Sequence, residues 1–383
     1  MEEPDFPYEF DAKRRKIAQI YSKQKLMIGL FQGVLLPVVF LSLVYFSSFS
    51  NRLETNISSI LAGTPLSGYW MVAILYVIAL MALVFLAGLP ISFYSGFKME
   101  HDYGLSNQSV PDWIKDQVKS LSISLLITTP LITGVFYLGR TYPERWWLFA
   151  GLILFAFMGI MSNIAHLVLM PLFFKTEILE DEELSARLKR MAEDNGVKGV
   201  EKVVKVHASD KTEKANAGFA GMGKSKRIYL FDTLLDKFHR KEVEGVVAHE
   251  MGHYANHDVL RYIVLEGLLI FPVFFFVDRI FTNWASFDNI FHLPLFLLIL
   301  YGLYSFIDPI TLAYSRHRER KADIFALQAI RDPRIMISAF KRLSDIDLAE
   351  IRPKRIVEVL FYSHPAPGKR LDMAKEWFKE PSS

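Results

Sequence analysis

The sequence contains no cysteine. Without thiols the chain forms no disulfides, binds no metal through thiolates and uses no cysteine nucleophile. Net charge is also low, because 44 Lys and Arg against 41 Asp and Glu leave a formal charge of +3. No strip of basic residues with interleaved aromatics occurs, so the composition argues against a nucleic-acid partner. The first 24 residues mix acidic and basic side chains without an apolar core, which is not the pattern of a signal peptide.

Apolar residues, in contrast, are in excess. Hydrophobic residues make up 51% of the chain, Phe alone occupies 31 positions, and the mean hydropathy is +0.22. Charged residues still make up 22%. A soluble enzyme rarely has a positive mean hydropathy, and a simple channel rarely has so many charges. The combination indicates membrane-spanning segments and a polar domain on one chain.

Most of the apolar residues lie in six runs, which cover residues 27–49, 69–95, 121–139, 146–174, 260–277 and 293–313. A membrane-spanning helix needs about 20 mostly apolar residues. The fifth run is short and includes Arg261 and Glu266, so a buried core helix is the alternative for it. The sequence predicts a mainly α-helical, polytopic membrane protein of about six transmembrane helices, with four in residues 1–174 and two in residues 259–313.

Basic residues alternate between the segments that connect these runs. They gather before the first run, in residues 96–120 and after the fourth and sixth runs, whereas residues 50–68 contain only Arg52. Because basic loops tend to stay in the cytoplasm, we expect both termini and the polar residues 175–258 on the cytoplasmic side of an integral, multi-pass protein. The membrane would be the cell membrane in a prokaryote and the endoplasmic reticulum membrane in a eukaryote.

Residues 175–258 are expected to form a small α/β insert. Apolar spacing predicts helices at 181–195 and from 232 to 237, and alternation predicts strands at 203–207 and 227–231. The Gly-rich residues 216–223 lie between the strands and match no phosphate-binding pattern, so a hairpin loop is expected there.

The letters HEMGH at His249–His253 give the strongest chemical signal. Two histidines four residues apart lie on one helix face, where both imidazoles can reach one metal ion. Glu250 lies beside them and can take a proton from an attacking water, which is the HExxH arrangement of zinc hydrolases. Chance predicts roughly 0.03 such patterns in a chain of this composition, so two unrelated surface histidines are the weaker explanation.

A catalytic zinc site needs a third protein ligand and an open position. His257 is one candidate, but on an unbroken helix it lies about 6 Å further along the axis, too far to complete a tetrahedron. Glu319, after the sixth run, is the better candidate, and a salt bridge among surface charges is its alternative role. Asp323 lies one turn beyond Glu319, where it can accept the second N–H of a ligating histidine. One Zn²⁺ is the expected cofactor.

These motifs and their surroundings resemble the type I CAAX prenyl endopeptidases, which are membrane-embedded zinc metalloproteases. The similarity covers most of the chain and includes, in order, RRKIAQIYSKQK, LPISFYSGFKMEHDYGLSNQSVPDWIKDQ, NAGFAGMGKSKRIYLFDTLL, VVAHEMGHY, SRHRERKADIFAL and SHPAPGKRL. Many metalloproteases share HExxH alone, whereas this ordered set is specific to the family.

The resemblance implies zinc ligands at His249, His253 and Glu319. It also implies a general base at Glu250 and a carboxylate at Asp323 that orients a ligand. The zincin-like portion at residues 175–258, which includes the HExxH helix, and a C-terminal portion at residues 314–383 would together form the catalytic part of the protein.

Two further residues are similar to positions that bind substrate in this family, and two more are similar to its catalytic positions. Asn216 and Ala217 resemble the sheet-edge segment whose backbone pairs with an extended peptide, a mode that leaves side-chain choice to pockets. His364 resembles an electrophilic histidine that stabilises the oxyanion, and Arg370 resembles its companion.

The expected function is that of a zinc metalloendopeptidase that cleaves near the C-terminus of prenylated, CAAX-type substrates. A general membrane-protein quality-control zinc protease of the HtpX type is the alternative among enzymes. A transporter or receptor with a vestigial metal site is the alternative from another class, and the intact ligands together with Glu250 disfavour it. The expected partners are a peptide or prenylated peptide and the lipid bilayer.

Overall fold

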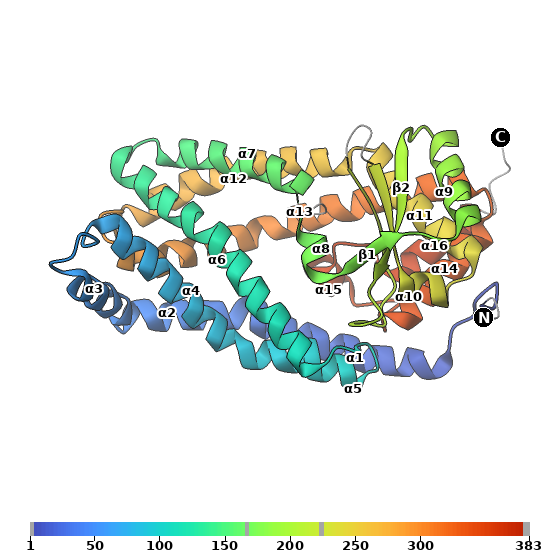
Figure 1. Ribbon diagram of the computed structural model, residues 1–383, viewed down its shortest axis with the longest axis horizontal. Coiled ribbons are helices and arrows are strands. Elements are labelled where there is room, and N and C mark those ends of the chain that lie inside the picture. The colour runs from blue at the N-terminus through green and yellow to red at the C-terminus, as the bar shows by residue number, and fades with distance from the viewer. Residues whose placement is uncertain (1–3, 165–167, 222–225, 378–383) are drawn as a thin grey trace.

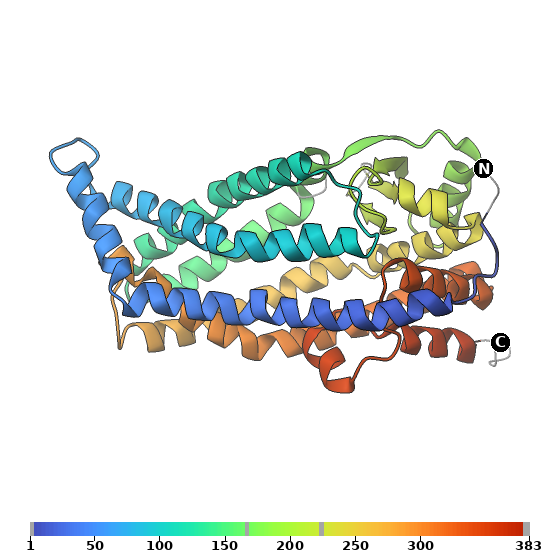
Figure 2. The same cartoon turned by 90° about the horizontal axis from the view of Figure 1, so that it is seen from below.

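The computed structural model describes residues 4–164, 168–221 and 226–377 of the chain. Long helices run side by side along the molecule, and a small sheet with several short helices closes one end (Figure 1). The start of the first helix and the last helix both lie at that end (Figures 1 and 2). This arrangement agrees with the expectation that both termini share one side with residues 175–258.

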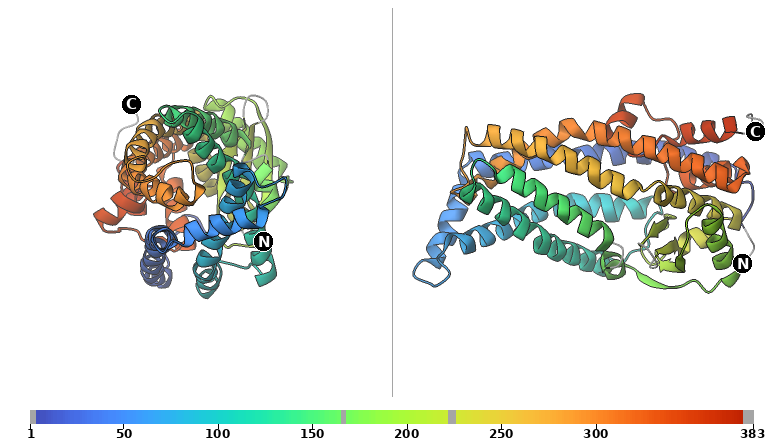
Figure 3. Two further views of the ribbon diagram at one scale, coloured as in Figure 1. Left: turned by 90° about the vertical axis from the view of Figure 1, so that its left-hand side faces the viewer. Right: turned by 90° about the horizontal axis from the view of Figure 1, so that it is seen from above.

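Before the sheet, the chain forms helices that run lengthwise, apart from α3, which crosses the end remote from the sheet (Figure 3). In order they are α1 (Ala12–Leu30), the π-helical turn η1 (Phe31–Leu35), α2 (Leu36–Phe46), α3 (Phe49–Leu61), α4 (Tyr69–Phe93), the π-helical turn η2 (Tyr94–Lys98), α5 (Met99–Asp102), α6 (Val110–Thr141), α7 (Trp146–Ile164) and α8 (Met170–Phe173).

The sheet and its helices follow, and two more long helices interrupt this part of the chain. The elements are β1 (Lys175–Ile178), α9 (Glu182–Asp194), β2 (Val200–His207), β3 (Ala217–Ala220), β4 (Lys226–Phe231), α10 (Asp232–Lys237), α11 (Arg240–Ala255), α12 (Asp258–Phe281), the 3₁₀ turn η4 (Ile290–His292), α13 (Leu293–Ile330), α14 (Pro333–Ile346), α15 (Arg355–Phe361) and α16 (Pro367–Trp377).

Within the described residues, five helical segments are long and apolar enough to cross a membrane: Ala12–Phe46, Tyr69–Asp102, Val110–Thr141, Asp258–Phe281 and Ile290–Ile330. Their outer faces expose large apolar side chains, among them Phe306 at 82% and Leu126 at 77%, which suits a lipid surrounding. The fourth predicted run forms the shorter apolar helix α7 and then α8. The fifth run, which was short in the sequence, extends to the 24 residues of α12.

An aromatic cluster holds the long helices together at the end remote from the sheet. Phe136 of α6, Phe281 of α12 and Phe296 of α13 pack edge to face, and Trp146 of α7 contacts Phe296. The indole N–H of Trp146 donates to the buried carboxylate of Asp278 at 2.6 Å. Part of the excess of phenylalanine therefore forms the core of the helical bundle.

The sheet has the strand order β1-β2-β4-β3. β2 and β4 run parallel in its centre, while β1 and β3 pair antiparallel with β2 and β4, respectively. The predicted strands and helices of the insert are confirmed, but the hairpin loop at 216–223 is partly wrong. Ala217–Ala220 forms an edge strand because its backbone pairs with β4 in the register Ala217 to Leu230. Residues 222–225 lie outside the described part.

α13 joins the membrane part to the polar part without a break. It runs for 38 residues from Leu293 to Ile330, so the predicted boundary between residues 313 and 314 falls inside one helix. Its second half packs beside α11 at the sheet end, where Glu319 and Asp323 are buried. One continuous helix thus extends from the membrane span to the sheet end and places Glu319 and Asp323 in the candidate site.

Candidate active site

α11 carries the HEMGH residues and is fixed at its start by a capping box. The ring of His239 accepts the backbone N–H of Lys241 at 3.2 Å, and the carboxylate of Glu242 accepts the backbone N–H of His239 at 2.9 Å. Arg342 of α14 donates to the same buried carboxylate at 2.7 Å. Capping of this kind satisfies N–H groups that a helix start leaves open, and here it sets the direction of α11.

Gly252 decides how closely α11 and α13 approach each other. A Cβ atom at this position would lie 2.9 Å from the Cα of Ala322 on α13, closer than real side chains come. Because glycine lacks a Cβ, the two helices cross in backbone contact. This close crossing carries Glu319 to the histidines of α11.

Three side chains converge at the crossing. Glu319 Oε2 lies 3.2 Å from His249 Nε2, and Glu319 Oε1 lies 3.3 Å from His253 Nε2. The two Nε2 atoms are 3.2 Å apart. One ligand atom from each of these residues lies within 4.8 Å of the other two, so among the described residues they form a group that could hold one metal ion.

The environment of this group fits a divalent cation. Glu319 Oε2 is buried and accepts no hydrogen bond. Burial lowers the pKa of His249, but the carboxylates of Asp323 and Glu319 outweigh that effect and raise the pKa to about 9. The site therefore favours positive charge at this point. Two imidazoles and one carboxylate are also a common ligand set of catalytic zinc.

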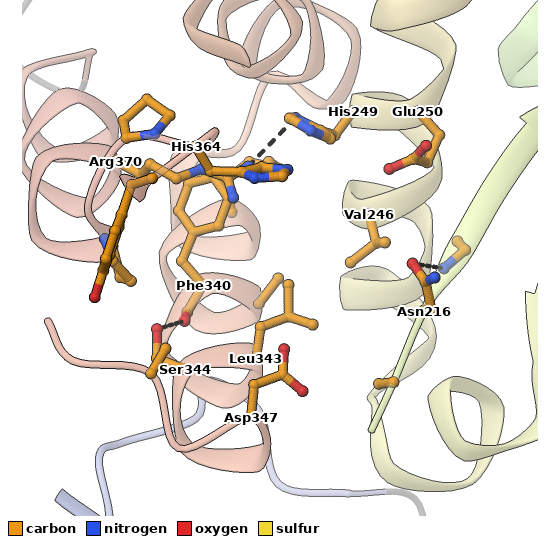
Figure 4. Close-up of a pocket in the computed structure, with 18 residues that line it drawn as sticks. Asn216, Val246, His249, Glu250, Phe340, Leu343, Ser344, Asp347, His364 and Arg370 are labelled. Carbon is orange, nitrogen blue, oxygen red and sulfur yellow. Dashed lines mark hydrogen bonds between the residues drawn. The ribbon is translucent and has the colours of Figure 1, made fainter. Parts of the chain in front are cut away.

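Glu250 faces a cleft beside this group (Figure 4). Burial raises the pKa of its carboxyl, and the nearby His249 and His253 oppose the rise. The cleft has a volume of about 370 Å³ and lies between α11 and α14. Asn216 and Ala217 line it at the start of β3, whose outer edge pairs with no strand in the described residues. A free strand edge thus borders the carboxyl group.

His364 reaches the same cleft from the loop between α15 and α16. Its Nε2 lies 3.2 Å from Glu319 Oε1. Arg316 holds the start of this loop by donating to the carbonyl oxygen of Tyr362 at 2.7 Å, and the carboxylate of Glu358 accepts the N–H of Ala366 at 3.1 Å. The two bonds fix the loop on either side of His364.

The fold gathers all of the residues predicted for the site around this cleft or directly behind it. They are Asn216, Ala217, His249, Glu250, His253, Glu319, Asp323, His364 and Arg370. Their individual roles remain predictions.

Comparison with known proteins identifies the family. A family model described as peptidase family M48 matches residues 179–378, which is more than half of the chain. The chain belongs to peptidase family M48. A second family model, described as CAAX prenyl protease N-terminal with five membrane helices, matches residues 4–175. The protein is therefore a membrane metalloprotease, and both the predicted family and the predicted mainly α-helical membrane fold are confirmed.

Individual relatives agree with this assignment. The uncharacterized metalloprotease YhfN of Bacillus subtilis is 29% identical over 94% of this chain and 85% of its own length. CAAX prenyl protease 1 of Saccharomyces cerevisiae is 31% identical over 59% of this chain and 49% of its own length. The crystal structure of S. mikatae Ste24p shares the fold with a TM-score of 0.82 at 24% identity, covering 94% of this chain and 88% of that chain.

In this M48 chain, a carboxylate paired with an arginine lies behind His249. Asp323 Oδ1 is 2.8 Å from His249 Nδ1, and Arg370 of α16 donates to Asp323 Oδ1 and Oδ2 at 2.5 and 2.9 Å. Such a partner holds an imidazole in the tautomer that presents its other nitrogen to a metal. Arg370 also lies close to His249 itself, with its Nη2 atom 3.4 Å from His249 Nδ1, and it lines the cleft.

A second pair of the same kind, which was not predicted from the sequence, lies behind His253. Asp258 Oδ2 is 2.8 Å from His253 Nδ1, and Arg318 Nε donates to Asp258 Oδ1 at 2.5 Å. Both side chains are almost completely buried. The only signal in the sequence is indirect, since Arg318 directly precedes Glu319 and Asp258 follows the HEMGH residues by five positions.

His257 does not join the metal-binding group. The helix is in fact broken before this residue, because α11 ends at Ala255 and His257 adopts a left-handed conformation with φ of 53°. Asn256 caps the end of α11, where its side-chain amide and its backbone N–H both donate to the carbonyl oxygen of Gly252, at 2.8 and 3.0 Å. The break turns Asp258, rather than His257, toward His253.

Proposed function

We propose that the protein is a zinc-dependent endopeptidase that hydrolyses peptide bonds near the C-terminus of prenylated, CAAX-type substrates. One observation carries the proposal: Glu250 faces a cleft between a three-residue metal-binding group and a free strand edge. The relatives named CAAX prenyl protease 1 and the matching N-terminal family model support the substrate class.

His249, His253 and Glu319 would hold the zinc ion. When bound, zinc supplies a Lewis acid that polarises the scissile carbonyl and makes a water molecule more acidic. The carboxylates of Asp323 and Asp258 keep the two imidazoles oriented, because each accepts from the Nδ1 side of its ring.

Glu250 moves the protons of the reaction. Its carboxylate takes a proton from the attacking water and later delivers it to the nitrogen of the leaving amine. A general base works best when its pKa lies near the working pH, and burial moves the pKa of Glu250 in that direction. The group therefore suits both steps of the transfer.

The substrate backbone would lie along the cleft in extended form. The N–H and C=O groups of the β3 edge at Asn216 and Ala217 can pair with such a peptide without reading its side chains. His364 would donate an N–H to the oxygen that becomes negative in the transition state, and Arg370 would position His249 through Asp323.

We assign the sheet end of the molecule to the cytoplasm. The segment before α2 carries several lysines and arginines, and basic residues follow the membrane part of α13 as well. Basic segments stay in the cytoplasm, so the site would face cytoplasmic substrates whose lipid group enters the bilayer.

Cleavage of a farnesylated CAAX peptide by the purified protein, with a chelator added to one sample, tests this function. We expect cleavage that stops with the chelator and returns with zinc. The Glu250→Gln protein should retain zinc and lose most of its turnover, since a general base contributes about 100- to 10,000-fold. Cleavage of an unfolded membrane protein but of no prenylated peptide would instead favour the quality-control alternative. Zinc binding without any proteolysis would contradict both.

A further inference from the structure

A carboxylate that the proposed mechanism does not use faces the same cleft. Asp347 directly follows α14 and closes it, with its backbone N–H donating to the carbonyl oxygen of Leu343 at 2.9 Å. Its side chain points into the cleft, at the end away from His249 and Glu250 (Figure 4). Its Oδ1 atom is buried and has no hydrogen-bond partner.

The charged groups nearest Asp347 are already paired with one another. Lys214 binds Glu100 at 2.6 Å, and Lys25 donates to the hydroxyl of Tyr21 at 3.0 Å, while that hydroxyl donates to Glu100 at 2.6 Å. Burial raises the pKa of Asp347 to about 6, even though Lys214 and Lys25 oppose the rise. At neutral pH the carboxylate is thus mostly ionised and lacks a direct partner, which costs free energy unless a ligand compensates for it.

An apolar wall separates this carboxylate from the candidate catalytic residues. Val246 of α11 and Leu343 of α14 lie between Asp347 and the ring of His249 (Figure 4). Asn216 lies on the opposite side of the cleft (Figure 4). In an extended peptide, side chains that point the same way recur every second residue, roughly 7 Å apart. A peptide on the β3 edge would place one side chain against the apolar wall and a later one near Asp347.

We propose that Asp347 forms an anionic subsite of the cleft that binds a lysine or arginine side chain of the substrate, a few residues away from the scissile bond. The inference rests on the proposed function, because it assumes that a peptide occupies the cleft. A metal ion is the less suitable occupant, since among the described residues Asp347 belongs to no group of metal-binding side chains. A long basic side chain can cross the apolar wall with its methylene groups and reach the carboxylate with its charged end.

Binding and cleavage measured on one set of peptides test the subsite. Each position near the scissile bond is set in turn to Lys, Ala or Glu. Binding is followed by fluorescence anisotropy with the zinc-loaded Glu250→Gln protein, which does not consume the peptide. At one position we expect Lys to bind roughly 10- to 100-fold more tightly than Glu, the range that a hydrogen bond to a charged group supplies.

Variants of Asp347 should change this preference in a defined order. Asp347→Asn should reduce the ratio of Lys to Glu binding to near one, Asp347→Lys should invert it, and Asp347→Glu should keep its direction. Asp210→Asn removes an exposed carboxylate outside the cleft, so the preference should remain. Melting temperature and zinc content show whether each variant is folded.

The results separate the subsite from the proposed function. Equal binding of the Lys and Glu peptides by the Glu250→Gln protein overturns the subsite, whether or not any variant folds, and so does a preference that survives in Asp347→Asn. Absence of cleavage by the unmodified protein overturns the endopeptidase instead, even if the binding preference is present.

Discussion

The carboxylate of Asp258 lies 2.8 Å from Nδ1 of His253, while the Nε2 atom of the same ring lies 3.3 Å from Glu319. This pair exists because the chain breaks its helix at His257 and starts α12 with Asp258. Arg318 holds the carboxylate from the other side, within 2.5 Å. The ring of His253 is thereby fixed with one nitrogen toward an acid and the other toward the candidate metal position.

Replacement of Asp258 by Asn should therefore weaken metal binding. The neutral amide accepts a weaker hydrogen bond from His253 and orients the ring less firmly, and loss of such a partner typically costs about 10- to 100-fold in metal affinity. Competition with a fluorescent zinc chelator measures the change. Asp278→Asn is the matched control, because Asp278 is a buried carboxylate of the same helix that binds Trp146 at the other end. Equal zinc affinity of Asp258→Asn and the unmodified protein would show that the pair is structural.

The third ligand can be assigned by zinc content alone. Glu319→Ala should purify without zinc, since two imidazoles that remain cannot complete a site with three protein ligands. His257→Ala should keep the full metal content, because His257 lies outside the group formed by His249, His253 and Glu319. Atomic absorption on both purified proteins measures this. Zinc retained by Glu319→Ala but lost from His257→Ala would transfer the role to His257.

The parts of the site that depend on helical spacing were predictable from the sequence. His249 and His253 lie one turn apart on one helix, and Asp323 lies one turn beyond Glu319 on another. The geometry of a single helix therefore defines the relative positions within each pair. The apolar runs were predictable for a similar reason, because a bilayer requires a minimum length of helix.

Contacts that depend on a break or on a pairing between distant segments were not predictable. Asp258 reaches His253 only because His257 takes a left-handed conformation, and nothing in the neighbouring residues indicates that conformation. The sequence predicts that Ala217–Ala220 belongs to a Gly-rich loop, yet its pairing with β4 makes it a strand. Likewise, the close crossing of α11 and α13 at Gly252 depends on which residue of α13 faces it.

Loss of the His364 side chain should affect turnover and spare the metal. Its Nε2 lies within 3.2 Å of Glu319 Oε1, but it is not one of the three grouped residues. His364→Ala should lower kcat by about 100- to 1000-fold, as loss of one donor to a transition-state oxyanion does. Steady-state kinetics with a zinc assay on the same sample measure both effects. Asp210→Asn, which changes an exposed residue outside the cleft, should stay close to the unmodified protein. A His364→Ala protein that raises KM alone would contradict an oxyanion role.

Single cysteines can determine which end of the molecule faces the cytoplasm. The chain has no cysteine, so the unmodified protein serves as a control that a thiol reagent does not label. Ser58 is exposed on α3 at the remote end, and Ala186 is exposed on α9 beside the sheet. In intact cells a membrane-impermeant maleimide should label Ser58→Cys, whereas Ala186→Cys should need permeabilised cells. The reverse pattern would place the site outside the cytoplasm.

Asp347 should make the stability of the protein depend on pH. Its carboxyl has a pKa of about 6 in the folded chain against 3.8 as its ordinary value, so the folded state binds its proton more tightly than the unfolded state does. Stability is lost as the pH rises above about 4 and levels off above about 6, at a total cost of at most about 3 kcal/mol. Asn does not titrate, so Asp347→Asn should melt at a higher temperature than the unmodified protein, by a larger margin at pH 8 than at pH 5. Thermal unfolding in detergent at both pH values, with Asp210→Asn as the exposed control, measures the margin. A margin that does not change with pH would mean that Asp347 already has a compensating partner, and a subsite that binds a basic side chain would then lose its physical basis.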